Sequence, residues 1–108
     1  MKELTEILSN IDKSIDEYND MDLFHYKQLS EILRVLTSNL FYLEKHRIEA
    51  YNSWHEVYFT CKQTSNVAKE RWADNQVPEL YKMRRIMTSA YKIVEAIRSQ
   101  ISIYKKEN

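Results

Sequence analysis

The residues of this chain that could act at a metal ion are three histidines and one cysteine. The histidines are His25, His46 and His55, and the cysteine is Cys61. Helical di-iron proteins place a glutamate three residues before a histidine on each of two helices, whereas here only His25 has an acid at that spacing, Asp22. His46 and His55 are nine residues apart, which puts them on nearly opposite sides of a helix. The sequence therefore predicts no metal site and no cofactor.

Nucleophilic catalysis is the next chemistry to test. Cys61 and His55 are six residues apart, a spacing that separates their side chains by more than a helical turn, so core packing is the preferred interpretation of Cys61. The chain has no glycine, which removes phosphate-cradling loops and the sharp turns that present a nucleophile. No pair of tyrosines or carboxylates has a spacing typical of an acid and a base. We therefore predict a non-enzyme without a small-molecule substrate.

Binding of nucleic acid is better supported by the residue types near the end of the chain. The candidate phosphate-binding residues are Lys82, Arg84, Arg85, Lys92 and Arg98, with Lys105 and Lys106 beyond them. Tyr81, Tyr91 and Trp72 are candidate stacking groups for bases. The alternative is a solvated helix face on which the tyrosines pack rather than stack. Because the formal net charge of the chain is zero, binding would depend on this local patch and would weaken with salt.

The charges are segregated along the chain. Residues 1–22 hold two lysines and seven acids, residues 23–77 hold seven bases and six acids, and residues 78–108 hold seven bases and three acids. An acidic beginning and a basic end attract each other within one chain or between antiparallel copies. We interpret the segregation first as a source of fold or assembly specificity, and second as a functional basic surface.

Long helices must position these residues, because the chain has no glycine and one proline. Apolar residues recurring at spacings of three and four predict helices over residues 2–18, 22–74 and 78–105. The tripeptide Thr-Ser-Asn occurs at residues 37–39 and 64–66, and either copy could break the central helix. We favour continuity because the apolar register passes through both copies. The last helix follows a turn before Pro78.

These elements predict an all-α fold in one domain spanning residues 1–108. A short N-terminal helix, a long central helix and an antiparallel C-terminal helix would form an elongated, coiled-coil-like hairpin or bundle. The first helix would fold back on the beginning of the central helix, and the last on its end. The aromatic face is wider than one seam needs, which predicts self-association. The candidate interface residues are Tyr51, Trp54, Tyr58, Trp72, Met87 and Val94.

Compartment and membrane contact are also constrained by composition. No apolar run approaches the roughly 20 residues that span a bilayer, and the acidic N-terminal residues are unlike a signal peptide. The single cysteine excludes an intrachain disulfide, which favours a reducing compartment. We expect a cytoplasmic protein without a membrane partner.

Residues 44–102 resemble small helical proteins encoded by tailed bacteriophages. The resemblance covers about 60 residues and is carried by four segments, at residues 44–51, 64–69, 78–81 and 96–102, which read EKHRIEAY, TSNVAK, PELY and AIRSQIS. It implies an accessory protein in the bacterial host cell that meets DNA, or a DNA-processing partner, in recombination or replication. It brings no catalytic motif, so no site residue is transferred.

Three functions therefore remain open from the sequence. The preferred one is a self-associating, non-enzymatic phage accessory protein that binds nucleic acid through its last helix. The alternatives are an adaptor or inhibitor that binds a host or phage protein, for example a defence or replication factor, and a structural coiled-coil component of a larger particle.

Overall fold

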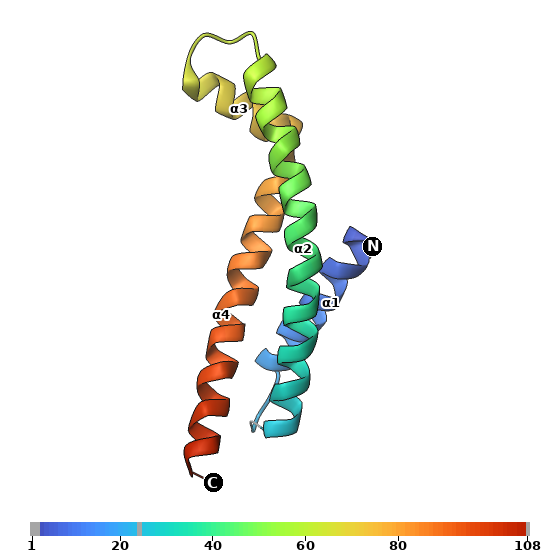
Figure 1. Cartoon of the computed structure of the whole chain (residues 1–108), viewed down its shortest axis with the longest axis vertical. Helices are drawn as coiled ribbons and strands as arrows, with labels where there is room; N and C mark the ends of the chain where they lie inside the picture. Colours follow the sequence, from blue (N-terminus) through green and yellow to red (C-terminus); the bar gives the residue numbers. More distant parts are fainter. Residues whose placement is uncertain (1–2, 24, 108) are drawn as a thin grey trace.

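The computed structural model describes residues 3–23 and 25–107. Within them the chain forms four helices and no strand: α1 (Leu4–Asn19), α2 (Tyr26–Thr60), α3 (Asn66–Gln76) and α4 (Pro78–Glu107) (Figure 1). The molecule is elongated, with principal extents of 61 × 26 × 20 Å. The predicted all-α, elongated fold is confirmed. The predicted start of the first helix, at residue 2, lies outside the described residues.

Helices α2 and α4 run antiparallel along the length of the molecule (Figure 1). Two contacts show how the two helices are aligned. The rings of Tyr26 and Tyr104 stack at one end, with centroids 5.0 Å apart, and the guanidinium of Arg84 lies 5.7 Å from the ring centroid of Tyr51 towards the other. Because α4 begins at Pro78, six residues before Arg84, it covers α2 from its beginning to beyond residue 51. The expectation that the last helix would cover the end of the central helix was wrong, because α3 occupies that place.

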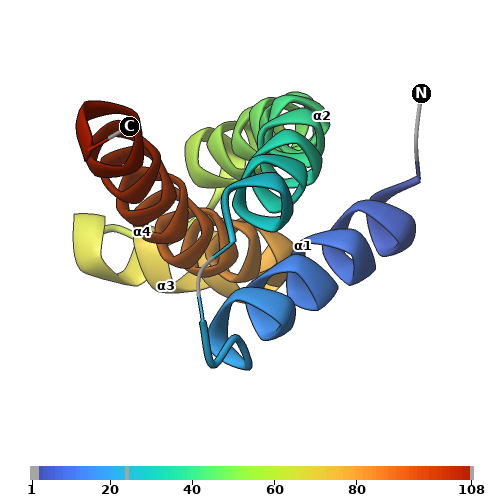
Figure 2. The same ribbon diagram turned by 90° about the horizontal axis from the view of Figure 1, so that it is seen from below.

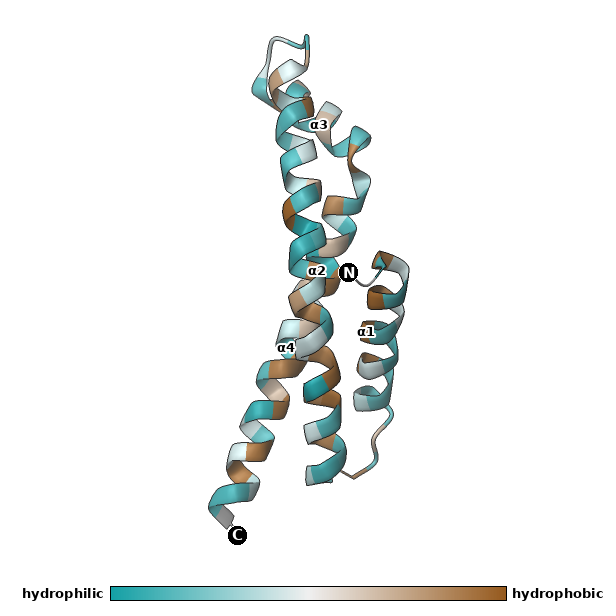
Figure 3. Cartoon of the chain, turned by 45° about the vertical axis from the view of Figure 1, so that its right-hand side comes forward, coloured by the Kyte–Doolittle hydropathy of each residue, from teal (hydrophilic) through white to brown (hydrophobic). Residues whose placement is uncertain are grey.

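Helix α1 packs mainly on α2, and α4 is its second neighbour. Seen along the molecule, α1, α2 and α4 surround a common interior (Figure 2). The apolar positions of these helices turn towards one another (Figure 3). Each helix contributes side chains that are 0% exposed, among them Ile7, Ile11, Leu36, Leu43 and Ile97. Burial of each such side chain favours folding by about 1.5–3 kcal/mol, so this interior holds the hairpin together.

A polar pair interrupts the apolar contact between α1 and α2. Asn39 is 2% exposed; its Nδ2 donates to the carbonyl of Val35 at 2.8 Å, and its Oδ1 accepts from Nδ2 of Asn10 at 3.2 Å. Both hydrogen-bonding ends of the buried Asn39 amide are therefore satisfied, one within α2 and one by α1.

The prediction of one unbroken helix over residues 22–74 was wrong. Helix α2 begins at Tyr26 and ends at Thr60, and α3 begins at Asn66. Ser65 caps α3, because its Oγ accepts from the backbone N–H of Ala68 at 3.1 Å. The second Thr-Ser-Asn copy thus supplies a helix start in place of a continuing turn.

Helix α3 folds back beside the end of α2 and is held there by two side-chain hydrogen bonds. Nε1 of Trp54 donates to Asp74 at 2.8 Å, and the hydroxyl of Tyr58 donates to Oδ1 of Asn66 at 3.2 Å. The chain then turns at Val77 and enters α4 at Pro78. The predicted boundary at the proline is confirmed.

Candidate nucleic-acid interface

The heptad spacing of the core of α4 determines where its basic residues lie. Leu80, Met83, Met87, Ala90, Val94 and Ile97 are buried and form the inner face. Positions seven residues apart drift by only about 20° around a helix, so they form rows along it. One row on the outer face consists of Arg84, Tyr91, Arg98 and Lys105, and a second consists of Arg85, Lys92, Ser99 and Lys106. All eight residues are exposed.

Between these two rows lies a third, which is mostly uncharged. It consists of Tyr81, Thr88, Glu95 and Ser102, all exposed. The guanidinium of Arg85 lies 5.9 Å from the ring centroid of Tyr81. A shallow hollow of about 290 Å³ is lined by Arg84, Arg85, Thr88 and Ser89, which together offer guanidinium and hydroxyl donors of the kind that bind phosphate oxygens. Glu95 is the acid within this otherwise basic outer face.

No cation of α4 is neutralised within the part of the chain that the structure describes. The ion pairs found there are Glu31–Arg34 and Glu44–Arg47, both within α2. The five predicted nucleic-acid-binding residues, Lys82, Arg84, Arg85, Lys92 and Arg98, are all exposed on α4. Arg84 and Arg98 share the first row, Arg85 and Lys92 share the second, and Lys82 lies beyond the second row towards α1. The structure therefore brings all five to the outside of one helix about 45 Å long.

On one side, the first row borders α2. Arg47 of α2 is held by Glu44, whose carboxylate accepts from Nε at 3.1 Å. That carboxylate raises the pKa of Arg47, with smaller contributions from the nearby Tyr51 and Tyr91. Conversely, the hydrogen bond from Arg47 lowers the pKa of Glu44. Arg84 of the first row lies over the ring of Tyr51 on the same helix as Arg47.

Sequence reasoning missed Arg47 as part of this surface and assigned Tyr51 to a protein interface. A signal was present, because Arg47 is a charged residue within the apolar stripe of the central helix, where the spacing calls for a core residue. A cation at such a position lies at the edge of a helix contact, with its charged end turned to solvent.

On the other side, the basic face borders the acidic helix α1. A hollow of about 410 Å³ is lined by Asp12 and Ile15 of α1 and by Lys82, Arg85 and Ile86 of α4, together with Ser89. The acidic beginning of the chain therefore lies beside its basic end, as the charge segregation predicts. Arg85 is the member of the second row that lines this hollow, and no residue of the first row lines it.

The six predicted interface residues separate into three groups. Trp54 and Tyr58 stack with ring centroids 5.3 Å apart and, through their hydrogen bonds, fasten α3 to α2. Tyr51 lies beside the basic face, and Trp72 is 46% exposed on α3. Met87 and Val94 are 6% and 3% exposed and pack in the core of the chain. Met87 and Val94 are therefore not available to an interface formed by the folded chain.

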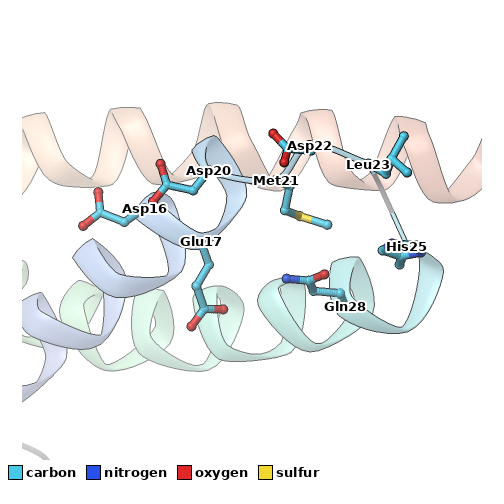
Figure 4. Close-up of a pocket in the computed structure, with 8 residues that line it drawn as sticks. All are labelled: Asp16, Glu17, Asp20, Met21, Asp22, Leu23, His25 and Gln28. Atoms are coloured by element: carbon cyan, nitrogen blue, oxygen red, sulfur yellow. The ribbon is translucent and has the colours of Figure 1, made fainter.

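The histidines and acids with potential metal chemistry lie elsewhere. Asp22 and His25 both line a shallow hollow of about 540 Å³ at the connection between α1 and α2, with Asp16, Glu17 and Asp20 (Figure 4). The carboxylates point in different directions, and within residues 3–23 and 25–107 no three histidine, cysteine or acidic side chains gather closely enough to hold a metal ion. Asp22 and His25 also lie outside the helices, so their spacing of three does not place them on one helical face.

The fold and this surface define a class of structure: an elongated helical hairpin of α2 and α4, with α1 and α3 packed against it and a cationic, tyrosine-bearing outer face on α4. Comparison with known proteins finds no matching protein family, no matching curated protein and no matching solved structure. Within its described residues, none of the helices combines the length and the apolar character needed to cross a membrane.

Proposed function

We propose that this protein is a non-enzymatic accessory factor that binds nucleic acid through the outer face of α4. The observation that carries the proposal is the pair of exposed cationic rows, which are unpaired within the described chain and flanked by tyrosine rings. Cations that are already free and aligned bind phosphates by releasing counterions, which makes the binding salt-dependent. The charge balance of the whole chain does not oppose this, because only three of its sixteen acids lie in residues 78–108.

The test is a charge reversal on the outer face. Arg84, Arg85 and Lys92 are replaced together by glutamate, and binding of labelled nucleic acid is measured by fluorescence anisotropy at low and at physiological salt. The triple variant should lose binding while circular dichroism and light scattering report the same helicity and the same assembled mass. Binding as tight as that of the unaltered protein would overturn the proposal.

Self-association is part of the proposed function. Phe41 and Ile48 are 60% and 47% exposed and lie seven residues apart on α2, so they share one outward line. Exposed apolar residues aligned on a helix are typical of contact with another helix. Sedimentation analysis should show a wild-type oligomer that Ile48→Glu dissociates; a wild-type monomer at all concentrations would contradict this part.

A second candidate function is an adaptor or inhibitor that binds a host or phage protein. The observation that favours it is the aromatic end of the molecule, where Phe59, Val67 and Trp72 are 74%, 60% and 46% exposed. Aromatic residues supply anchors at protein interfaces. A pull-down from host lysate should recover a protein that the variant Phe59→Ala/Trp72→Ala loses. Recovery of nothing above background would count against this function.

The biological setting follows from the resemblance of residues 44–102 to phage proteins and stays a prediction. It places the activity in phage recombination or replication, in the cytoplasm of the bacterial host. The third alternative, a structural component of a larger particle, predicts that the outer rows of α4 become buried on assembly. Protection of Lys92 and Lys105 from amine-modifying reagents in the assembled state would favour it over nucleic-acid binding.

A further inference from the structure

Three exposed tyrosines lie among the cations of the candidate interface. Tyr91 is 47% exposed, Tyr81 65% and Tyr51 37%. None of their hydroxyls donates a hydrogen bond to a described residue, whereas Trp54 and Tyr58 use their polar atoms to fasten α3. The fold therefore does not depend on a hydrogen bond from any of these hydroxyls, and each tyrosine leaves part of its surface open to a ligand.

The spacing of cations and rings is regular along α4. Arg84, Tyr91 and Arg98 follow one another at intervals of seven residues, or about 10.5 Å along the axis. The row thus alternates cation, ring and cation over about 21 Å. Beside its first cation lies a further ring, since Arg84 is 5.7 Å from the centroid of Tyr51.

A single strand matches this alternation. Each of its nucleotides offers a base with an open π-face and a phosphate, so bases can stack on tyrosine rings while phosphates lie against neighbouring cations. In a duplex the bases are already stacked on one another, and only phosphates and groove edges are offered to a protein. Tyrosines between the cations add contact area for a single strand and little for a duplex.

The position of the row beside α2 also favours a single strand over a duplex. A major groove is about 12 Å wide, and a single helix with its side chains has a diameter of about 10–12 Å. The row of Arg84, Tyr91 and Arg98 lies on the side of α4 that borders α2. If α4 entered a major groove, α2 would keep this row outside it. A flexible strand has no such restriction.

We propose that Arg84, Tyr91 and Arg98, with Tyr51 of α2 beside them, form a track for extended single-stranded nucleic acid, with bases stacked on the two tyrosines and phosphates on the arginines. The inference rests on the proposed function and narrows it to one class of ligand. The features on which it depends, the phosphate charge and the open base face, are shared by DNA and RNA.

The test compares a labelled strand of about 20 nucleotides, as DNA and as RNA, with a duplex of the same length in anisotropy titrations at several salt concentrations. Tyr91→Ala should weaken single-strand binding by about five- to 150-fold without changing its salt dependence, which is the range found when a stacking residue is removed. Tyr91→Phe keeps the ring and should retain the affinity. Phe59→Ala removes a more exposed aromatic residue from α2, away from the track, and serves as the control.

The outcomes separate this inference from the proposed function. If neither single strand nor duplex binds at low salt, the proposed function fails. If both bind equally well, and Tyr91→Ala behaves like Phe59→Ala, the protein binds nucleic acid but the track is refuted. Photocrosslinking of an iodouracil-containing strand, followed by peptide mapping, gives an independent measurement. Crosslinks at Tyr91 or Tyr51 support the track, and crosslinks confined to other residues overturn it.

Discussion

Removal of two arginines from the row that borders α2 should reduce the salt dependence of nucleic-acid binding by a calculable amount. The perturbation is Arg84→Gln with Arg98→Gln. Both side chains are exposed and neither forms an intrachain ion pair with a described residue, so the substitutions should leave the fold intact. They remove phosphate-binding charge without introducing repulsion.

The magnitude follows from the number of unpaired cations in the row, which are Arg84, Arg98 and Lys105. Arg47 is not counted, because Glu44 already pairs with it. At about 0.7 per phosphate on a single strand, three contacts give a slope of about −2.1 for log K against log salt. A rise from about 50 to 200 mM salt then weakens binding about 18-fold, and only about 2.6-fold when one cation remains.

Anisotropy titrations at four or more salt concentrations give the slope for each protein. The matched control is Lys27→Gln with Lys62→Gln, which removes the same charge from exposed positions outside α4. If the control lowers the slope as much as the arginine variant, the effect comes from net charge and the argument from the row is refuted. A slope unchanged in the arginine variant would refute it as well.

Three further outcomes are expected. Glu95→Gln removes the acid between the cationic rows and should strengthen binding about two- to five-fold at low salt, measured by the same titrations, because a charge a few Å away is worth up to about 1 kcal/mol in water. Trp54→Phe keeps the ring but loses the donor to Asp74, so amide hydrogen exchange in α3 should quicken while that in α4 does not. Arg47 lowers the pKa of Glu44, so this carboxyl stabilises the fold at neutral pH and the contribution is lost as the pH falls through its folded-state pKa. Glu44→Gln should therefore lower the free energy of unfolding in urea at neutral pH, by less than about 1 kcal/mol for so exposed a pair, and should have no effect in acid.

The two copies of Thr-Ser-Asn show why sequence predicted the helices but not the break. In the first copy, Thr37 donates to the carbonyl of Leu33 within α2, and Asn39 is buried beneath α1. In the second copy, Ser65 caps a new helix, and the residues around it are exposed. The same three residues thus continue a helix at 37–39, where α1 covers Asn39. They begin a new helix at 64–66, where they are exposed. Local propensity does not contain that difference, because tertiary contacts decide it.

The candidate interface was predictable to the extent that it belongs to one helix. The five basic residues of α4 were identified because the heptad spacing and Pro78 fix the register of that helix from the sequence alone. Tyr51 and Arg47 were not assigned to the same surface, because their placement beside α4 depends on how far the hairpin is shifted along its axis. That shift follows from the break after Thr60, which moved α4 along α2.

The hydrogen bond between Asn10 and Asn39 decides which surface charges meet. Apolar contacts are non-directional, so they specify the position of α1 along α2 less sharply than a hydrogen bond does; one alternative position is a slide by a helical turn, about 5.4 Å. Such a slide would leave the Oδ1 of Asn39 buried without its donor, which costs about 1–3 kcal/mol. The hydrogen bond between Asn10 and Asn39 therefore favours one position of α1 along α2. With α1 held there, Asp12 lies beside Lys82 and Arg85 and leaves Arg84, Tyr91 and Arg98 uncovered, so an uncharged contact in the core sets how much of the cationic exterior is masked.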